Sequence, residues 1–110
     1  LVVVNISTFR DIISKHDCDL ELARKNIDIA GSSALRVGAK NFIHTMTLTN
    51  PSSYKQFIDS LRVNKGATTI RQRIDATKKT FKMLSHYDGA ISNYIENLDI
   101  GKALECYDII

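Results

Sequence analysis

The sequence predicts an all-α fold, a compact bundle of about six short-to-medium helices with room for one short N-terminal strand. Apolar residues recur every three or four positions in one segment after another, which is the period of an amphipathic helix. Ser, Thr, Asp or Asn precedes most of these segments, as residues that cap helix N-termini do. The single proline and five glycines argue against a turn-rich β-fold. At 110 residues, the chain is predicted to be a single helical binding domain over residues 1–110.

The N-terminal half is predicted to begin with a strand and to continue as three helices. Three valines within residues 1–6 favour the strand. Ser7 can cap a first helix, and Asp19 can cap a second that ends at Gly31. Ser32 or Ser33 can cap the third helix. The first helix carries Phe9, Ile12, Ile13 and His16, the second Leu20, Ala23, Ile27 and Ala30, and the third Leu35, Ala39, Phe42, Ile43 and Met46.

The C-terminal half is predicted to contain four more helices after a β-leaning connector at residues 47–49. Asn50-Pro51 is typical of a helix start, and Gly66 of the stop that follows. Thr68 or Thr69 then opens the longest helix, which runs to about Ser85. Asp88 and Asp99 can cap two short final helices. The predicted inner face of the longest helix consists of Ile70, Ile74, Thr77, Phe81 and Leu84.

The net charge of +3 is distributed unevenly along the chain. Residues 62–82 carry seven basic residues against Asp75 alone, and residues 83–110 carry five acidic residues against Lys102 alone. Most of the basic residues share one side of the predicted longest helix, where Asp75 can pair with Arg71 or Lys79. Such a surface attracts acidic partners. We therefore predict a partner-binding site made of Arg62, Lys65, Arg71, Lys78, Lys79 and Lys82, with an ordinary solvated helix face as the alternative.

Sequence motifs for catalysis or cofactor binding are missing. The chain has no phosphate-binding loop, no nucleophile elbow and no pair of residues at zinc-ligand spacing. The cluster of residues 16–19 is better explained by a helix end than by a metal site. Cys18 and Cys106 are expected to be free thiols in a reducing, intracellular compartment. From these patterns we predict no enzymatic activity, no cofactor, no metal, no membrane contact and no small-molecule substrate.

The whole chain resembles the C-terminal domain of a rhabdovirus-type phosphoprotein, from a negative-strand RNA virus. The resemblance is carried by the compact helical unit, the basic helix, a start at Leu1 in place of Met, and the ending at residues 106–110. It implies the C-terminal part of a longer protein, located in the host cytoplasm or nucleus. It further implies a polymerase cofactor that docks on the viral nucleoprotein–RNA template for transcription and replication. The docking surface would be the six basic residues named above.

Two other functions fit the same residues. The basic face could bind nucleic acid directly, through its phosphates. Alternatively, leftover apolar stripes could be buried between copies of the chain, in a structural oligomerisation domain.

Overall fold

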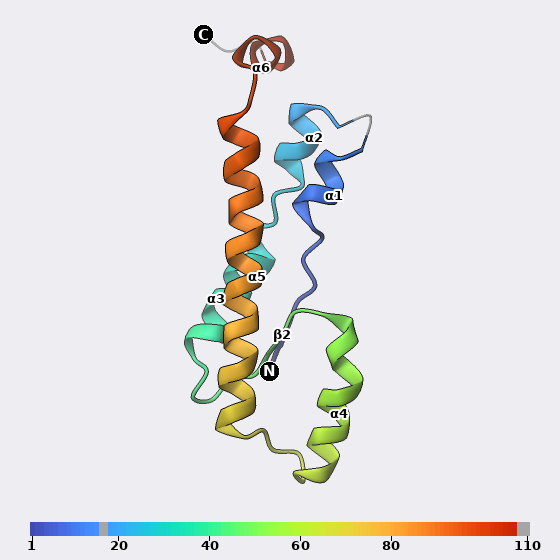
Figure 1. Cartoon of the computed structure of the whole chain (residues 1–110), viewed down its shortest axis with the longest axis vertical. Helices are drawn as coiled ribbons and strands as arrows, with labels where there is room; N and C mark the ends of the chain where they lie inside the picture. The colour runs from blue at the N-terminus through green and yellow to red at the C-terminus, as the bar shows by residue number, and fades with distance from the viewer. Residues whose placement is uncertain (16–17, 108–110) are drawn as a thin grey trace. The chain divides into compact units, whose positions relative to one another are not determined.

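The structure is a computed structural model that describes residues 1–15 and 18–107. Most of this part of the chain is helical, so the predicted fold class is confirmed (Figure 1). Its elements are β1 (Val2–Val3), α1 (Phe9–Ile13), α2 (Leu20–Lys25), α3 (Ile29–Lys40), β2 (Thr47–Leu48), the 3₁₀ turn η1 (Pro51–Ser53), α4 (Tyr54–Val63), α5 (Ile70–Glu96) and α6 (Ile100–Cys106).

The chain divides into two compact units. The first unit contains residues 1–6 and 28–84, and the second contains residues 7–27 and 85–110. Helix α5 contributes its first half to the first unit and its second half to the second.

Three of the predicted helix starts are confirmed by hydrogen bonds from side chain to backbone. The Asp19 carboxylate accepts from the Leu22 N–H at 2.7 Å, and the Asp99 carboxylate accepts from the Gly101 N–H at 2.8 Å. Asn50 caps the turn that leads into α4 in the same way. These side chains satisfy N–H groups that a helix start leaves without partners.

Three helix boundaries were predicted wrongly. The second helix ends at Lys25, and α3 begins at Ile29 under an Asp28 cap, so the Ser32 or Ser33 start is wrong. Helix α5 runs to Glu96 instead of Ser85, with Asp88 inside it. The helix continues past Asp88 because the side chains on its buried face, Tyr87 and Ala90, continue the core stripe.

The sheet of the first unit is a parallel pair of two-residue strands. Val2 is in register with Thr47 and Val3 with Leu48. The Val2 N–H donates to the Met46 carbonyl at 2.8 Å, and the Val4 N–H donates to the Leu48 carbonyl at 3.0 Å. The N-terminal strand is thus confirmed, whereas residues 47–48 form a strand where only a connector was predicted.

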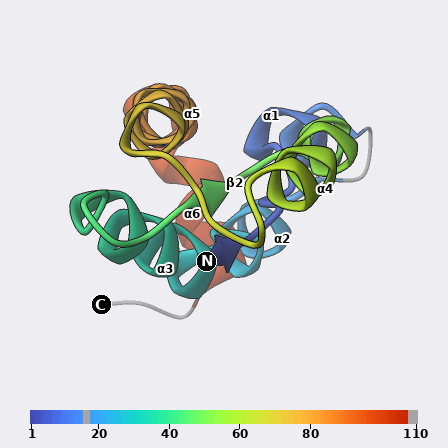
Figure 2. The same ribbon diagram turned by 90° about the horizontal axis from the view of Figure 1, so that it is seen from below.

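Helix α3 packs directly against this strand pair. Leu35 and Ala39 of α3 are fully buried, and β2 lies between α3 and the first half of α5 (Figure 2). A β-carbon at Gly38 would lie 2.9 Å from side-chain carbons of both Val2 and Thr47. The helix can approach the strands this closely only because residue 38 has no side chain.

The first half of α5 is held to the rest of the first unit mainly by polar contacts. The buried hydroxyls of Thr80 and Thr47 are 2.8 Å apart, and Thr80 also donates to the Ala76 carbonyl. The Arg73 guanidinium donates to the Phe42 carbonyl at 3.0 Å and to the Thr68 carbonyl at 2.6 Å. Arg73 therefore fastens the start of α5 to the end of α3.

The predicted inner face of α5 is wrong for three of its residues. Leu84 is 1% exposed, as predicted, but Ile70 and Phe81 are each 45% exposed and Ile74 is 36% exposed. The buried face consists instead of Ala76, Thr80, Leu84, Tyr87 and Ala90. Within the first unit, Thr80 of this face meets Thr47 of β2 through their hydroxyls, 2.8 Å apart.

The second unit is centred on Phe9, which is 1% exposed and meets the Tyr94 ring edge-on at a centroid distance of 5.5 Å. Burial raises the pKa of the Tyr94 hydroxyl. His16, predicted on the first helix, lies outside the described residues.

An exposed ionic network links α2 to the residue after α6 in this unit. The Arg24 guanidinium donates to both Glu21 oxygens at 2.8 Å, and the Tyr107 hydroxyl also donates to Glu21. The hydrogen bond from Arg24 holds the pKa of the Glu21 carboxyl well below its ordinary value, and the bond from Tyr107 has the next largest effect in the same direction. The same bond to Glu21 raises the pKa of Tyr107.

Candidate functional site

The carboxyl ends of β1 and β2 lie at the same edge of the sheet because the two strands are parallel. Asn5 follows β1 after one residue, and Thr49 and Asn50 come directly after β2. In open parallel sheets, ligands bind in the crevice beyond the carboxyl ends of the strands. This edge is therefore the first region of the unit to inspect for a site.

The start of α3 lies against the end of β1. The Asp28 carboxylate accepts a hydrogen bond from the Gly31 N–H at 2.6 Å. A β-carbon at Gly31 would lie 2.6 Å from the other Asp28 oxygen and 2.9 Å from a methyl carbon of Val4. The glycine thus lets the helix start, and with it a half-buried carboxylate, reach the edge where β1 ends.

The first residue of α4 bonds to the segment that follows β1. The Tyr54 hydroxyl donates to the Asn5 amide oxygen at 2.9 Å, across 49 positions of sequence. We call Asn5, Asp28 and Tyr54 the edge cluster. An amide, a carboxylate and a phenol can hydrogen-bond a polar ligand, and the carboxylate can exchange protons with it.

The edge cluster was missed from the sequence. Tyr54 was assigned to an apolar stripe, and the pattern of helix caps placed the start of the third helix four or five residues too late. The available signals were an Asn directly after a run of valines and an Asp three residues before a glycine at 31. These signals acquire meaning only once the chain has brought the β1 end and the α3 start together.

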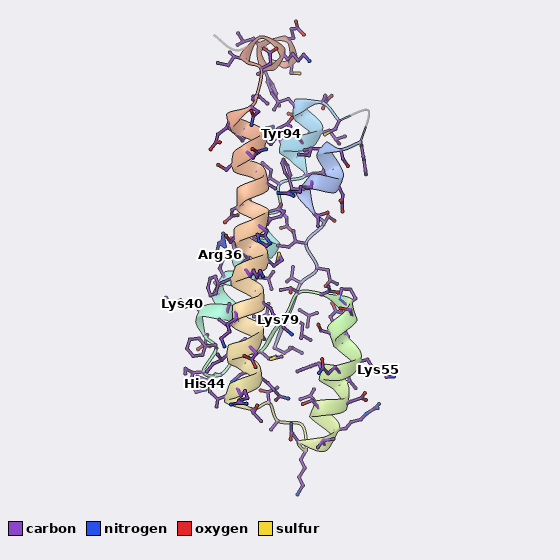
Figure 3. The ribbon with its side chains drawn as sticks, in the orientation of Figure 1. Arg36, Lys40, His44, Lys55, Lys79 and Tyr94 are labelled. Carbon is purple, nitrogen blue, oxygen red and sulfur yellow. The ribbon has the colours of Figure 1, made fainter. Side chains whose placement is uncertain are left out.

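Basic side chains form a ridge along α3 and the turn after it. Arg36, Lys40 and His44 are spaced by four residues, so they lie on successive turns (Figure 3). Lys40 and His44 are exposed and Arg36 is half-buried. The sequence contained this spacing, but none of the three residues was predicted as a site residue. The ridge attracts anions to the first unit.

The six predicted basic residues are distributed over α4, the turn after it and α5. Arg62 lies on α4 and pairs with Asp59 at 3.5 Å, while Lys65 occupies a left-handed turn with φ of 52° before Gly66. These two residues therefore belong to elements other than α5, which carries the remaining four.

On α5, Arg71, Lys78 and Lys82 are exposed and share one side of the helix by their spacing, whereas Lys79 lies on the side that faces α4 (Figure 3). Asp75 pairs with Lys78 at 3.3 Å and not with Arg71 or Lys79 as predicted. A partner-binding role for the six residues stays a prediction.

Within residues 1–15 and 18–107, no three side chains of the His, Cys, Asp or Glu type come together as a metal site would require. No helix in this part of the chain has the length and apolar character needed to cross a bilayer. Cys18 and Cys106 are both free thiols, half-buried and exposed respectively.

Comparison with known proteins gives a consistent assignment. Residues 38–108 match the family model of the AICARFT/IMPCHase bienzyme. The bifunctional purine biosynthesis protein PurH of Chlorobium phaeobacteroides is 39% identical over 103 residues, which cover 94% of this chain and 20% of that protein. PurH of Microcystis aeruginosa is 38% identical over 99 residues, 90% of this chain and 19% of that protein. The chain thus spans about a fifth of the length of these curated relatives.

These similarities overturn several predictions made from the sequence. The resemblance to a viral phosphoprotein is wrong, and so are the polymerase-cofactor role and the nucleoprotein partner that it implied. The host-cell location gains no support. Direct nucleic-acid binding and structural oligomerisation gain no support either. The predictions of no enzymatic activity and no small-molecule substrate fail because the matching proteins are metabolic enzymes. A basic helix and a compact helical unit are common to many families, which is why they misled. The chain belongs to the AICARFT/IMPCHase bienzyme family.

Proposed function

We propose that this chain forms part of a purine-biosynthesis enzyme, with the AICAR transformylase and IMP cyclohydrolase activities that its family name denotes. AICAR and IMP are then its small-molecule substrates or products. The family match over residues 38–108 carries this proposal. An intracellular location, expected from the cysteine content, agrees with such an enzyme, and we propose the cytoplasm as the compartment.

The edge cluster suits the cyclohydrolase reaction better than the transformylase reaction. A cyclohydrolase opens or closes a ring with the gain or loss of water, which requires proton transfer and correct placement of the reacting ends. The Asp28 carboxylate can exchange the proton. The Tyr54 hydroxyl and the Asn5 amide, 2.9 Å apart, can orient the polar ring. The basic ridge on α3 would attract the anionic nucleotide towards the first unit.

The test is an Asp28→Asn substitution in the full-length enzyme that carries this chain, with both activities assayed separately. Asparagine caps a helix about as well as aspartate, so the start of α3 should persist. Cyclohydrolase activity should fall by at least about 100-fold, the usual contribution of a general acid or base. Transformylase activity should stay within a factor of two or so of wild type, in line with its separate chemistry.

Asp59→Asn is the matched control, because Asp59 is an exposed carboxylate on α4 that pairs with Arg62. It should leave both activities unchanged. If Asp28→Asn keeps full cyclohydrolase activity, the edge cluster is not the site of that reaction. If both activities fall together, the carboxylate acts on the fold and not on the ring.

A further inference from the structure

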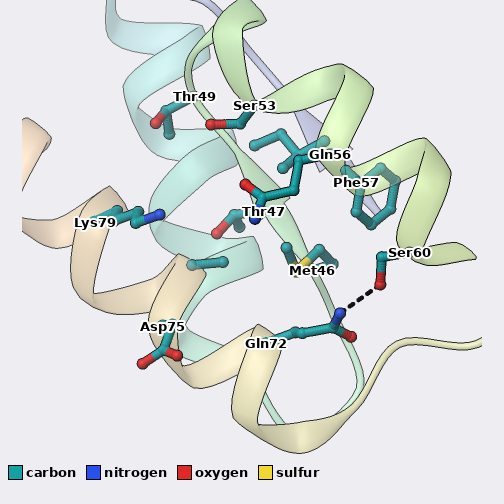
Figure 4. Close-up of a pocket in the computed structure, with 12 residues that line it drawn as sticks. Met46, Thr47, Thr49, Ser53, Gln56, Phe57, Ser60, Gln72, Asp75 and Lys79 are labelled. Atoms are coloured by element: carbon teal, nitrogen blue, oxygen red, sulfur yellow. Dashed lines mark hydrogen bonds between the residues drawn. The ribbon is translucent and has the colours of Figure 1, made fainter.

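A pocket outside the edge cluster lies between β2, α4 and the first half of α5. Its volume is about 210 Å³, and its walls come entirely from the first unit (Figure 4). An engineered apolar cavity of about 150 Å³ holds benzene, so this pocket has room for a ring system somewhat larger than benzene. Neither the family assignment nor the proposed role of the edge cluster gives this pocket a function.

The pocket walls include several apolar surfaces. Phe57 of α4 and Met46, which precedes β2, are half-buried and line the space together with the buried Leu48 and Ala76. An aromatic ring and a thioether both make favourable contacts with the faces of flat rings. This part of the pocket suits a planar ring better than a flexible chain.

Hydrogen-bonding groups border the apolar walls, and some of their capacity is unused. Ser60 accepts hydrogen bonds from the Gln72 amide at 2.5 Å and from the Asn64 amide at 3.2 Å, which leaves its own O–H free to donate. Gln72 is held in place, because its amide oxygen also accepts from the Thr69 N–H. Gln56 lines the pocket, and its side-chain amide makes no hydrogen bond with the described residues. The edge of a bound ring would therefore find both donors and an acceptor.

Lys79 supplies a positive charge at the same pocket. It is exposed, and its ammonium group forms no ion pair with the described residues. Asp75, the nearest acidic residue along the helix that also lines the pocket, pairs with Lys78 at 3.3 Å instead. The charge of Lys79 is therefore available to an anionic group on a ligand that extends out of the pocket.

We propose that this pocket binds a flat heteroaromatic ring with an attached anionic group, of the class of a purine nucleoside monophosphate. The ring would lie between Phe57 and Met46, with its edge hydrogen-bonded to Ser60 and Gln56. The anionic group would pair with Lys79. Since neither Asn5 nor Asp28 lines the pocket, this binding is separate from the reaction proposed at the edge cluster.

The test is a titration of the folded, isotopically labelled 110-residue chain with adenosine 5′-monophosphate, followed by the backbone amide shifts. We expect saturable shifts at Met46, Ser60 and Lys79. Lys79→Gln should raise the Kd about tenfold, which is the loss of one charge-assisted contact. Free adenine should bind the wild type and the Lys79→Gln variant equally, because it lacks the anionic group.

Lys82→Gln is the matched control, since it removes an exposed charge of the same helix that does not line this pocket and leaves the Lys78–Asp75 pair in place. Equal weakening by Lys82→Gln and Lys79→Gln would overturn the proposal and indicate unspecific attraction to a basic helix. Inorganic phosphate that binds as tightly as the nucleotide would overturn the ring contact. Shifts confined to Asn5, Asp28 and Tyr54 would assign the nucleotide to the edge cluster and leave the pocket without a ligand. None of these results depends on whether Asp28→Asn lowers the cyclohydrolase activity.

Discussion

Two glycines on different helices stand in opposite surroundings. Gly38 of α3 faces Val2 and Thr47 so closely that a β-carbon would be 2.9 Å from each, whereas a β-carbon at Gly89 of α5 would meet nothing within 4 Å. Packing at position 38 requires a residue without a side chain, whereas position 89 has room for a β-carbon. Sequence alone cannot separate them, because each is a single glycine within a helical segment.

Gly38→Val should lower the free energy of unfolding by about 1–3 kcal/mol, the usual range for overpacking. Gly89→Ala should raise it by about 0.5–1 kcal/mol, because alanine restricts the unfolded chain and favours the helix. Urea unfolding followed by circular dichroism measures both. A neutral Gly38→Val would mean that α3 can move off the strands at no cost.

A second prediction at the residue scale concerns acid stability. Because the pKa of Glu21 in the folded chain lies below its ordinary value of 4.5, the stabilisation from its bonds to Arg24 and Tyr107 is complete above about pH 4.5. It is lost as the pH falls further and the carboxylate becomes protonated. The unfolding free energies of wild type and Glu21→Gln should therefore differ most at neutral pH and converge towards pH 3.

The measurement is a series of urea titrations of both proteins between pH 3 and pH 7, in which all other carboxylates cancel. Tyr107→Phe removes one of the two hydrogen bonds and should give an intermediate curve. Parallel curves for wild type and Glu21→Gln over the whole range would show that the network contributes nothing to stability.

At the scale of elements, α5 shows where periodicity succeeds and where it fails. Periodicity predicted a long helix in this region, and Thr69 and Gln72 cap its start as the Thr pattern suggested. The buried face of α5 was predicted wrongly because the search for apolar periodicity gives most weight to the largest apolar residues. The packing partner, a strand whose Thr47 hydroxyl meets Thr80 at 2.8 Å, selects small and polar residues instead.

The difference between the two faces of α5 can be measured. Leu84→Ala should lower the free energy of unfolding by about 2–5 kcal/mol, because Leu84 is 1% exposed and the deletion leaves a cavity. Phe81→Ala, at 45% exposure, should cost less than about 1 kcal/mol. Thermal and urea unfolding of the two variants would decide between the faces. A larger loss for Phe81→Ala would restore the face that periodicity favoured.

At the scale of the whole molecule, the helical class and most helix starts could be predicted, but the family could not. Helix caps and apolar stripes depend on residues close together in sequence. The helix starts at Asp19, Asn50 and Asp99 could therefore be predicted from the sequence itself. The edge cluster is not local, since it joins residues 5, 28 and 54 through a strand pair and a close helix approach. The residue types involved are common ones, and no short motif marks them.

The distribution of charge in the fold also could not be predicted from the sequence. The basic excess over residues 62–82 is real, but the fold distributes it among an ion pair on α4, a left-handed turn and different sides of α5. One member of the group, Arg73, donates to backbone carbonyls in place of a partner. A count of charges along the chain therefore cannot predict a surface.

The parallel pairing of β1 with β2 also has a consequence for the order of folding. The two strands can meet only after the intervening residues, including α3, have folded back, because parallel strands require a long crossover connection. Closing such a loop costs entropy before the contact offers any compensation, so pairings of this kind form late. Asn5 reaches Tyr54 only when β1 is in place. We therefore expect a refolding chain to regain most of its helix before it regains the edge on which the proposed chemistry depends.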